Sequence, residues 1–352
     1  MDQDPQGPTL SGASASADAA DDSDAIAEHY VPVAVTERSG VVESVHHGAV
    51  VVLDADGRVA WTAGDPDAMV YPRSALKPLQ AAAMVGAGLD VEDRLLAVVC
   101  ASHAGRPEHL AAVGELLACV GLDADALENT PAWPLDPAAH DDAVRNGCVP
   151  SAILQNCSGK HAGMLATSVV NGWATQAYSQ VEHPVQQLIL SALVGAVGEV
   201  GHVGVDGCGA PAPMVTLVAL ARAVRALAVE RHAVHVAMTG YPELVGGPDR
   251  DVTLLMRLVP GLLVKDGAEG VQVAALPDGR AVALKIADGS GRARAPVTIA
   301  ALRTLGVDLA ADAVPKPILG HGRSVGAVPR AGGAAVNERV FARANHHEMP
   351  HQ

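Results

Sequence analysis

The sequence predicts a chain that contains both strands and helices, and three stretches carry this prediction. A β-hairpin pattern spans 48–61, an apolar helix pattern follows at 72–85, and a second hairpin pattern spans 271–286. The chain has 352 residues, of which 49% are hydrophobic. This supply of apolar side chains can fill a sizeable core, so we expect a globular protein.

The chain begins with strands. β-branched residues cluster at 31–35 and 41–45, on either side of a Ser-Gly turn. A further strand at 48–53 passes through an Asp-Ala-Asp-Gly turn into 58–61. A turn of this kind between apolar runs is a strong hairpin signal, so strands lead the chain to the helix at 72–85.

That helix begins with a Ser-x-x-Lys pair, Ser74 and Lys77. Pro72 suits the first turn of a helix, and residues three apart share one face, so the Lys77 amine can reach the Ser74 hydroxyl. A lysine with its ordinary pKa of about 10.4 becomes a base for serine only when burial or a nearby cation lowers that pKa. The apolar helix favours burial, and its N-terminus offers N–H groups to an oxyanion. A lone Ser-x-x-Lys also occurs by chance on helix surfaces.

The next serine of interest follows an apolar run at 95–100. Ser102 stands at the end of this run, and Pro107 then opens a second helix that extends to about residue 120. We expect Ser102 to be exposed at this junction, and local sequence favours a helix-capping role for it over a catalytic one. Residues 123–150 contain four prolines and predict a long irregular connection.

Two glycine-rich turns carry thiols. The first, 153–164, contains Cys157 and Lys160, and the second, 205–213, contains Cys208 and leads into a helix that ends near residue 229. Two thiols with an amine or imidazole could hold zinc in a tetrahedral site. The segments lack Cys-x-x-Cys spacing, so two small buried thiols in tight turns are an equally good interpretation.

The stretch 261–271 predicts a strand, a turn that carries Lys265, and another strand. A lysine at a strand edge commonly stays solvated and prevents aggregation. Lys265 is functional instead if that edge faces Ser74. A closing helix is predicted over 296–305.

The two ends of the chain differ from its middle. Residues 1–28 are rich in Ala, Ser, Asp and Gly and predict a disordered acidic tail, because they cannot bury enough surface to offset chain entropy. The weakly patterned residues 326–352 form a second tail, which leaves 29–325 as the single main domain.

Composition excludes several partners. A formal net charge of −15 opposes binding to nucleic acid or to an anionic membrane, and 2% aromatic residues offer few stacking platforms. The sequence shows no basic flank followed by an apolar stretch and no long apolar run, so we expect a cytoplasmic protein. Five widely spread cysteines are then expected to be mostly reduced: Cys100, Cys119, Cys148, Cys157 and Cys208.

Five short segments occur in an order typical of one family: 73–78, 100–103, 156–164, 206–208 and 265–268. The most unusual of them is the string Asn-Cys-Ser-Gly-Lys-His. From about residue 31 to 306, the chain resembles the rhizobial-type, asparaginase II-like L-asparaginases. The resemblance implies an α/β fold of the α+β type that is similar to serine β-lactamases and glutaminases, with an antiparallel sheet flanked by helices and a helical lobe.

The resemblance also implies roles for individual residues. Two Ser-Lys pairs are expected in the active site, Ser74 with Lys77 and Ser102 with Lys265. Arg73, His161 and Asp206 match positions near the substrate. The metal ligands of the family, where a metal is present, match Cys157, Lys160 and Cys208. The stretches that follow Ser102 and Cys208 depart from the rhizobial pattern, which affects fine substrate preference more than the reaction.

The expected activity is hydrolysis of L-asparagine to L-aspartate and ammonia through an acyl-enzyme, with either serine as the first nucleophile. Zinc is a possible cofactor that the chemical step does not require, and a homodimer is the expected assembly. One alternative is a penicillin-recognising hydrolase of the same fold, since Lys265-Asp266-Gly267 stands where such enzymes carry Lys-Thr-Gly. The other alternative is a non-catalytic protein that binds zinc or an amino acid.

Overall fold

The computed structural model describes residues 27–328, so most of each predicted tail lies outside the described residues. Its main feature is an eight-stranded antiparallel sheet in the order β11-β12-β1-β2-β10-β9-β8, with β3 paired to β2. The strands are β1 (Val31–Arg38), β2 (Val41–Leu53), β3 (Val59–Ala63), β8 (Leu263–Gly267), β9 (Val271–Ala275), β10 (Ala281–Ile286), β11 (Pro317–Gly320) and β12 (Arg323–Ala327).

The long strand β2 organises this sheet. Its first half pairs with β1 and its second half pairs with β3, while β10 lies along its other edge. Residues 49–53 of β2 are fully buried because they have a strand on each side and helices packed nearby. Two small sheets stand apart: β4 (Met69–Val70) with β7 (Val215–Thr216), and β5 (Val203–Val205) with β6 (Pro211–Pro213).

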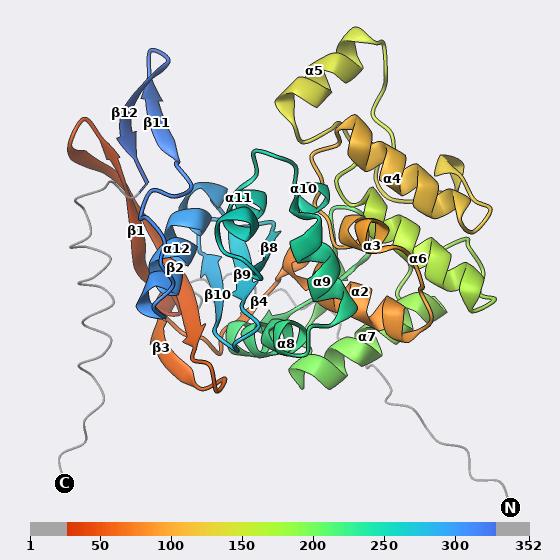
Figure 1. Ribbon diagram of the computed structural model, residues 1–352, viewed down its shortest axis with the longest axis horizontal. Coiled ribbons are helices and arrows are strands. Elements are labelled where there is room, and N and C mark those ends of the chain that lie inside the picture. The colour runs from red at the N-terminus through yellow and green to blue at the C-terminus, as the bar shows by residue number, and fades with distance from the viewer. Residues whose placement is uncertain (1–26, 329–352) are drawn as a thin grey trace, which may run out of the picture.

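Helices flank the sheet and form a separate lobe, which lies to the right of the sheet in Figure 1. The α-helices are α2 (Lys77–Gly86), α3 (Asp93–Val99), α4 (Pro107–Ala118), α5 (Pro137–Arg145), α6 (Ser158–Val170), α7 (Pro184–Val197), α8 (Leu217–Val229), α9 (Ala233–Gly240), α10 (Pro242–Val245), α11 (Asp251–Leu258) and α12 (Arg294–Thr304). Three short 3-10 turns are η1 (Arg73–Leu76), η2 (Ala124–Ala126) and η3 (Gly291–Ala293).

One continuous cluster of buried apolar side chains joins the sheet to the helical lobe. Helices α8 and α12 both pack against β9 and β10, and β8 packs against η1, α9 and α11. The last strand of the sheet therefore faces the start of the Ser74 helix. The predicted α/β fold of the α+β type, with an antiparallel sheet, flanking helices and a helical lobe, is confirmed.

Several local predictions were wrong. Residues 158–164 form the start of α6 rather than a turn, and the connection at 123–150 contains α5. Lys265 lies within strand β8 and not in a turn. Strand β12 extends to Ala327, two residues beyond the predicted end of the domain.

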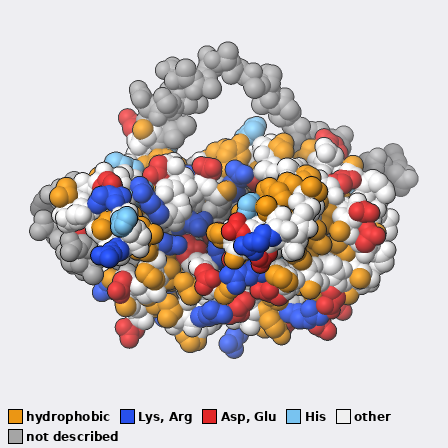
Figure 2. Space-filling view, turned by 90° about the horizontal axis from the view of Figure 1, so that it is seen from above, with side chains coloured by type: hydrophobic (Ala, Val, Ile, Leu, Met, Phe, Trp, Pro, Cys, Tyr) orange, Lys and Arg blue, Asp and Glu red, His pale blue; other side chains and the backbone are white. Residues whose placement is uncertain are grey.

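The surface carries both signs of charge. Figure 2 shows acidic and basic side chains interspersed over the face seen from above. Within the described residues, no helix is long and apolar enough to cross a membrane.

Candidate active site

Ser74 lies in the turn η1, between β4 and α2. The turn begins at Arg73, whose backbone φ of +53° is a left-handed conformation that non-glycine residues rarely adopt. The end of β8 packs directly on this turn, because a β-carbon at Gly267 would overlap the carbonyl oxygen of Pro72. The Ser74 residue is 9% exposed, and its hydroxyl makes no hydrogen bond to another described residue.

Ser102 follows α3 and is buried, with only 3% of its surface exposed. The prediction of an exposed serine was wrong, because its backbone N–H donates to the Val245 carbonyl at 3.0 Å and holds it against α10. It does not cap the next helix either, since Arg106 occupies that position. Its hydroxyl instead accepts hydrogen bonds from two amines, Lys265 Nζ at 2.9 Å and Lys77 Nζ at 3.4 Å.

Lys77 therefore contacts Ser102, which lies 25 residues away in the sequence, and not Ser74. Its Nζ also donates to the Ala101 carbonyl at 2.5 Å and to Cys157 Sγ at 3.2 Å. The apolar helix pattern correctly predicted a buried lysine, since Lys77 is 1% exposed. The Ser-x-x-Lys spacing did not predict the hydrogen-bond partner of that lysine.

Lys265 is fully buried in β8, so it is not a solvated edge residue. Besides Ser102, its Nζ contacts two oxygens of the next residue, Asp266: the backbone carbonyl at 2.7 Å and the carboxylate Oδ1 at 2.5 Å. Burial lowers the pKa of Lys265 to about 8, with Asp266 opposing this shift and Lys77 adding to it. A substantial fraction of the amine is thus neutral near pH 8.

Asp266 connects Lys265 to two arginines. Its Oδ2 accepts hydrogen bonds from Arg250 Nη2 at 2.5 Å and Arg294 Nη1 at 3.2 Å. Arg294 Nη2 in turn contacts Asp251 Oδ2 at 3.4 Å. Burial would raise the pKa of the Asp266 carboxyl, but Lys265 and the two arginines outweigh it and lower that pKa. Asp266 is therefore a buried carboxylate.

The predicted substrate residues Arg73 and Asp206 form an ion pair. Arg73 Nε donates to Asp206 Oδ1 at 2.7 Å, and the Gly207 N–H donates to the same oxygen at 2.7 Å. Burial would raise the pKa of Asp206, but Lys160 and Arg73 lower it below its ordinary value. The pair joins the Ser74 turn to the turn between β5 and β6.

The predicted metal ligands also converge. The turn between β5 and β6 brings Cys208 to the first turn of α6, where Lys160 Nζ lies 3.1 Å from Cys208 Sγ. Cys157, the N-cap of α6, packs with Cys208 and Ala210 in a small buried cluster. Gly159 permits this arrangement, because a β-carbon there would overlap a backbone carbonyl of α3.

The two thiols differ in protonation. The Cys157 thiol donates a hydrogen bond that lowers the pKa of Cys208 to about 5, against the effect of burial and with help from Lys160. The same bond and burial raise the pKa of Cys157 to about 12. Burial would lower the pKa of Lys160, but Cys208, Cys157 and Asp206 raise it. The cluster therefore holds a thiolate, a thiol and an ammonium group.

Two sulfur atoms and one nitrogen atom at one place form a donor set that fits zinc. Binding requires Cys157 and Lys160 to lose their protons, because only the thiolate and the neutral amine have the necessary lone pairs. Within residues 27–328 no group of three or more His, Cys, Asp or Glu side chains is arranged to hold a metal ion. A metal at this position thus depends on Lys160.

His161 is buried next to the thiol cluster. Its Nδ1 lies 3.0 Å from the Tyr178 hydroxyl, which also accepts the Glu128 N–H at 3.0 Å. Its Nε2 is buried and has no hydrogen-bond partner among the described residues. Burial and the nearby Lys160 charge hold the pKa of His161 well below its ordinary value, so the imidazole is neutral.

The comparison with known families matches this chain over residues 34–329 to the family described as L-asparaginase II. The match covers most of the chain and includes every residue discussed above. The chain belongs to the L-asparaginase II family. Family membership makes it a hydrolase, in agreement with the buried Ser-Lys arrangement.

Among curated proteins, none matches the chain. Among solved structures, a β-lactamase from Mycobacterium bovis aligns with 16% identity and a TM-score of 0.36, covering 74% of this chain and 95% of that one. EstCE1, a hydrolase with promiscuous acyltransferase activity, aligns with 14% identity and a TM-score of 0.34, covering 83% and 95%. Mglu in its native form aligns with 15% identity and a TM-score of 0.32, covering 73% and 62%.

The structure brings most of the predicted site residues of this L-asparaginase II family member into contact, whereas the Ser74 hydroxyl makes no hydrogen bond to another described residue. The site also includes residues that sequence reasoning missed. Asp266 contacts Lys265 and Tyr178 contacts His161, while Arg250 and Arg294 reach Lys265 only through Asp266. Asp266 had a usable signal, because a charged pair inside an apolar strand must find buried partners. The arginines and Tyr178 had none, since their contacts come from distant parts of the chain.

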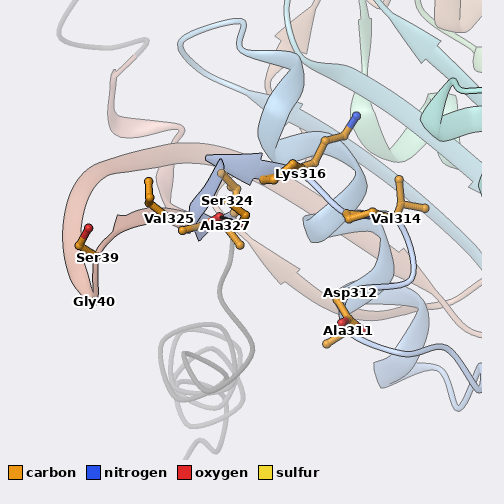
Figure 3. A pocket seen from close by; sticks show the side chains of 13 residues that line it. Ser39, Gly40, Ala311, Asp312, Val314, Lys316, Ser324, Val325 and Ala327 are labelled. Carbon is orange, nitrogen blue, oxygen red and sulfur yellow. Dashed lines mark hydrogen bonds between the residues drawn. The ribbon is translucent and has the colours of Figure 1, made fainter. Parts of the chain in front are cut away.

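A pocket of about 570 Å³ lies elsewhere, at the end of the sheet formed by the tip of the β1–β2 hairpin, by β11 and β12, and by the loop before β11 (Figure 3). Ser39, Lys316 and Val325 are among its lining residues. None of the predicted site residues lines it. The pocket is therefore separate from the Ser-Lys site.

Proposed function

We propose that this protein is an L-asparaginase that hydrolyses the side-chain amide of L-asparagine to L-aspartate and ammonia. The observation that carries the proposal is the convergence of two buried lysine amines on the Ser102 hydroxyl, close behind the Ser74 turn. A hydroxyl between two amines can accept a proton from one and pass another to the second. Membership in the L-asparaginase II family supports asparagine as the substrate.

Ser74 is the nucleophile in this proposal and Ser102 is the relay. Ser74 is the more exposed of the two, and its oxygen is free of hydrogen bonds to other described residues, whereas the Ser102 oxygen is engaged by both amines. Ser102 passes its own proton to the neutral amine of Lys265 and takes one from Lys77. Lys77 thereby gains a lone pair and accepts the proton that Ser74 releases as it attacks the amide carbon, a step for which the Lys77 amine must reach the Ser74 hydroxyl.

The remaining steps use the same groups in reverse. The proton returns through Ser102 to the leaving nitrogen, which departs as ammonia and leaves an aspartyl ester on Ser74. Water then attacks this ester, and the relay accepts the proton of that water as it accepted the proton of Ser74. The products are L-aspartate and the free Ser74 hydroxyl, so every proton is accounted for.

The Arg73 and Asp206 pair supports an amino-acid substrate. An α-amino acid carries a carboxylate and an ammonium group, and a guanidinium beside a carboxylate offers the complementary charges. Both side chains are partly exposed, at 26% and 13%, and Arg73 directly precedes Ser74. We place the head group of asparagine at this pair, with the neutral His161 nearby.

We also propose that Cys157, Lys160 and Cys208 hold zinc. Bound zinc would supply positive charge that stabilises the thiolates and would tie the start of α6 to the turn between β5 and β6. Lys77 donates to Cys157 Sγ, so this cluster also helps to orient Lys77. The proton relay itself runs through lysine and serine side chains alone.

The proposed setting is the cytoplasm, and the proposed assembly is a homodimer. The free, exposed thiols of Cys119 and Cys148 support a reducing compartment. Fractionation of the native host cells would test the location. Light scattering coupled to size-exclusion chromatography would test the assembly.

A coupled ammonia assay over asparagine, glutamine and a penicillin tests the proposed activity. Ammonia release from asparagine with acylation of Ser74 supports the proposal. Turnover of the penicillin without ammonia release from either amino acid would identify a penicillin-recognising hydrolase. Zinc or amino-acid binding without any turnover would identify a non-catalytic binding protein.

A further inference from the structure

The Lys265 amine has three polar contacts, and all three are oxygen atoms. Ser102 Oγ, the Asp266 carbonyl and Asp266 Oδ1 lie within 2.9 Å of Nζ. A neutral amine has two N–H groups and one lone pair. Once Lys265 has lost its proton, its two N–H groups can still serve the oxygens of Asp266, and its lone pair can accept the Ser102 hydroxyl proton. Lys77 donates to Ser102 from the other side, so the chain of hydrogen bonds has one direction.

The charges around Lys265 agree with this state. Asp266 is shared between Lys265 and two arginines, Arg250 and Arg294, and Arg294 also pairs with Asp251. The two negative charges of these carboxylates and the two positive charges of the guanidinium groups already cancel without a charge on Lys265. A proton on Lys265 would add a buried charge that lacks a counterion of its own, and such a charge is unfavourable.

Other groups around β8 do not alter this balance. On η1, Arg73 is paired with Asp206, and on α9, His235 Nε2 is engaged by a backbone carbonyl at 2.9 Å. Burial raises the pKa of Cys100, at the end of α3, to about 12, so it stays a neutral thiol. Strand β9 contains no titratable side chain. Lys77 is the remaining nearby cation, and it disfavours a second charge on Lys265.

We propose that Arg250 is a positioning residue for the hydrolytic site: by binding the Asp266 carboxylate, it prevents that charge from pairing with Lys265 alone and keeps the Lys265 amine ready to accept a proton. Arg250 precedes α11 and reaches Asp266 from outside the reacting groups. This inference rests on the proposed relay through Ser102. It adds a charged residue that acts through Asp266 and touches neither serine.

The test compares variants whose effects should differ in sign. Arg250→Gln removes the competing cation, so the midpoint of the pH–rate profile should rise by about one unit, with roughly tenfold slower reaction at neutral pH. Asp266→Asn removes the anion and should move the midpoint to lower pH. Arg250→Lys retains the charge and should stay close to the parent protein. The matched control is Arg257→Gln, which removes an arginine of α11 that is paired with Glu243. It should leave the midpoint of the pH–rate profile unchanged.

Two readouts separate this inference from the proposed substrate. The first is kcat/KM for ammonia release from asparagine, and the second is the rate of Ser74 sulfonylation by phenylmethylsulfonyl fluoride, followed by intact mass. Opposite midpoint shifts in the labelling rate support the inference even if asparagine is not hydrolysed. Unchanged midpoints, or shifts of the same sign in Arg250→Gln and Asp266→Asn, would overturn it. Absence of both reactions at every pH would also overturn it, because no serine would then be activated.

Discussion

The two serines of the site occupy opposite environments. Ser74 lies in a turn with a left-handed residue before it, and its hydroxyl makes no hydrogen bond to another described residue. Ser102 lies in a segment held on both sides by backbone hydrogen bonds, and its hydroxyl is engaged by Lys77 and Lys265. One oxygen is available to react, and the other is fixed between two amines.

In the proposed mechanism, this difference gives the two serines different roles. A nucleophile must move toward the substrate carbon, so a hydroxyl without competing bonds is suited to that role. A proton relay needs constant distances to the groups that give and take the proton, so a buried hydroxyl with two hydrogen-bond partners is suited to the relay role. Sequence spacing suggests that each serine has its own lysine, whereas the structure joins both lysines at Ser102.

Removal of Ser74 gives the largest expected effect. We expect Ser74→Ala to reduce kcat for ammonia release by about 10⁴-fold, because the hydroxyl of Ser102 is engaged by both lysine amines and does not replace the lost nucleophile. The double variant Ser74→Ala/Lys77→Met should be little worse than either single one, since both act in one unit. Circular dichroism and thermal unfolding control for folding. A folded Ser74→Ala protein with near-normal turnover would assign the nucleophile to Ser102.

Loss of the relay should cost less. We expect Ser102→Ala to lower kcat by roughly 10²- to 10³-fold, because Lys77 then loses its route to Lys265 while Ser74 remains. Mass spectrometry after rapid quenching should still detect the aspartyl ester on Ser74. If that ester is absent from Ser102→Ala and present in Ser74→Ala, the two roles are exchanged.

The pH profile should report Lys265. Its pKa is lowered to about 8, and only the neutral amine accepts a proton, so kcat/KM should rise with pH through this region and reach a plateau above it. Below the midpoint the rate should fall about tenfold for each pH unit, as expected for one required deprotonation. The profile is measured with asparagine at constant ionic strength. A value of kcat/KM that does not change between about pH 6 and about pH 9 would exclude Lys265 as the final base.

Removal of metal should have the smallest effect on the chemical step. We expect a chelator to raise KM by roughly tenfold, or about 1.4 kcal/mol of binding free energy, and to lower Tm, while kcat stays measurable. The thiol cluster contacts Lys77, and Cys208 lies two residues after Asp206, where we place the substrate. Loss of the metal should therefore disturb binding. The proton relay contains no metal ligand, so the chemical step should continue. Zinc content by elemental analysis provides the control. Complete, zinc-reversible loss of kcat in a folded protein would make the metal catalytic.

Much of the fold could be predicted because it depends on local pattern. The hairpins at 48–61 and 271–286 carry turn residues between apolar runs, and both are present as β2–β3 and β9–β10. The hairpin of β11 and β12 escaped prediction, because its half-exposed strands show no clear alternation of buried and exposed residues. The run at 95–100 was hard to assign, since a short buried apolar stretch has no diagnostic period.

The sequence by itself determined which chemical groups the site contains. Ser74, Lys77, Ser102 and Lys265 could be named from their motifs and from a family resemblance, and so could the two cysteines with Lys160. The glycines at 159 and 267 also belong to this local information, because each permits a backbone to approach another segment closely.

Only the tertiary structure decided which of these groups meet. Lys77 and Ser102 are on segments 25 residues apart, and Lys265 lies 163 residues beyond Ser102, so no local pattern specifies their contact. Packing of α2, α3 and β8 around a common core sets these distances. The same packing places Arg250 and Arg294 on Asp266, and the proposed role of Lys265 as a base depends on the resulting balance of buried charge.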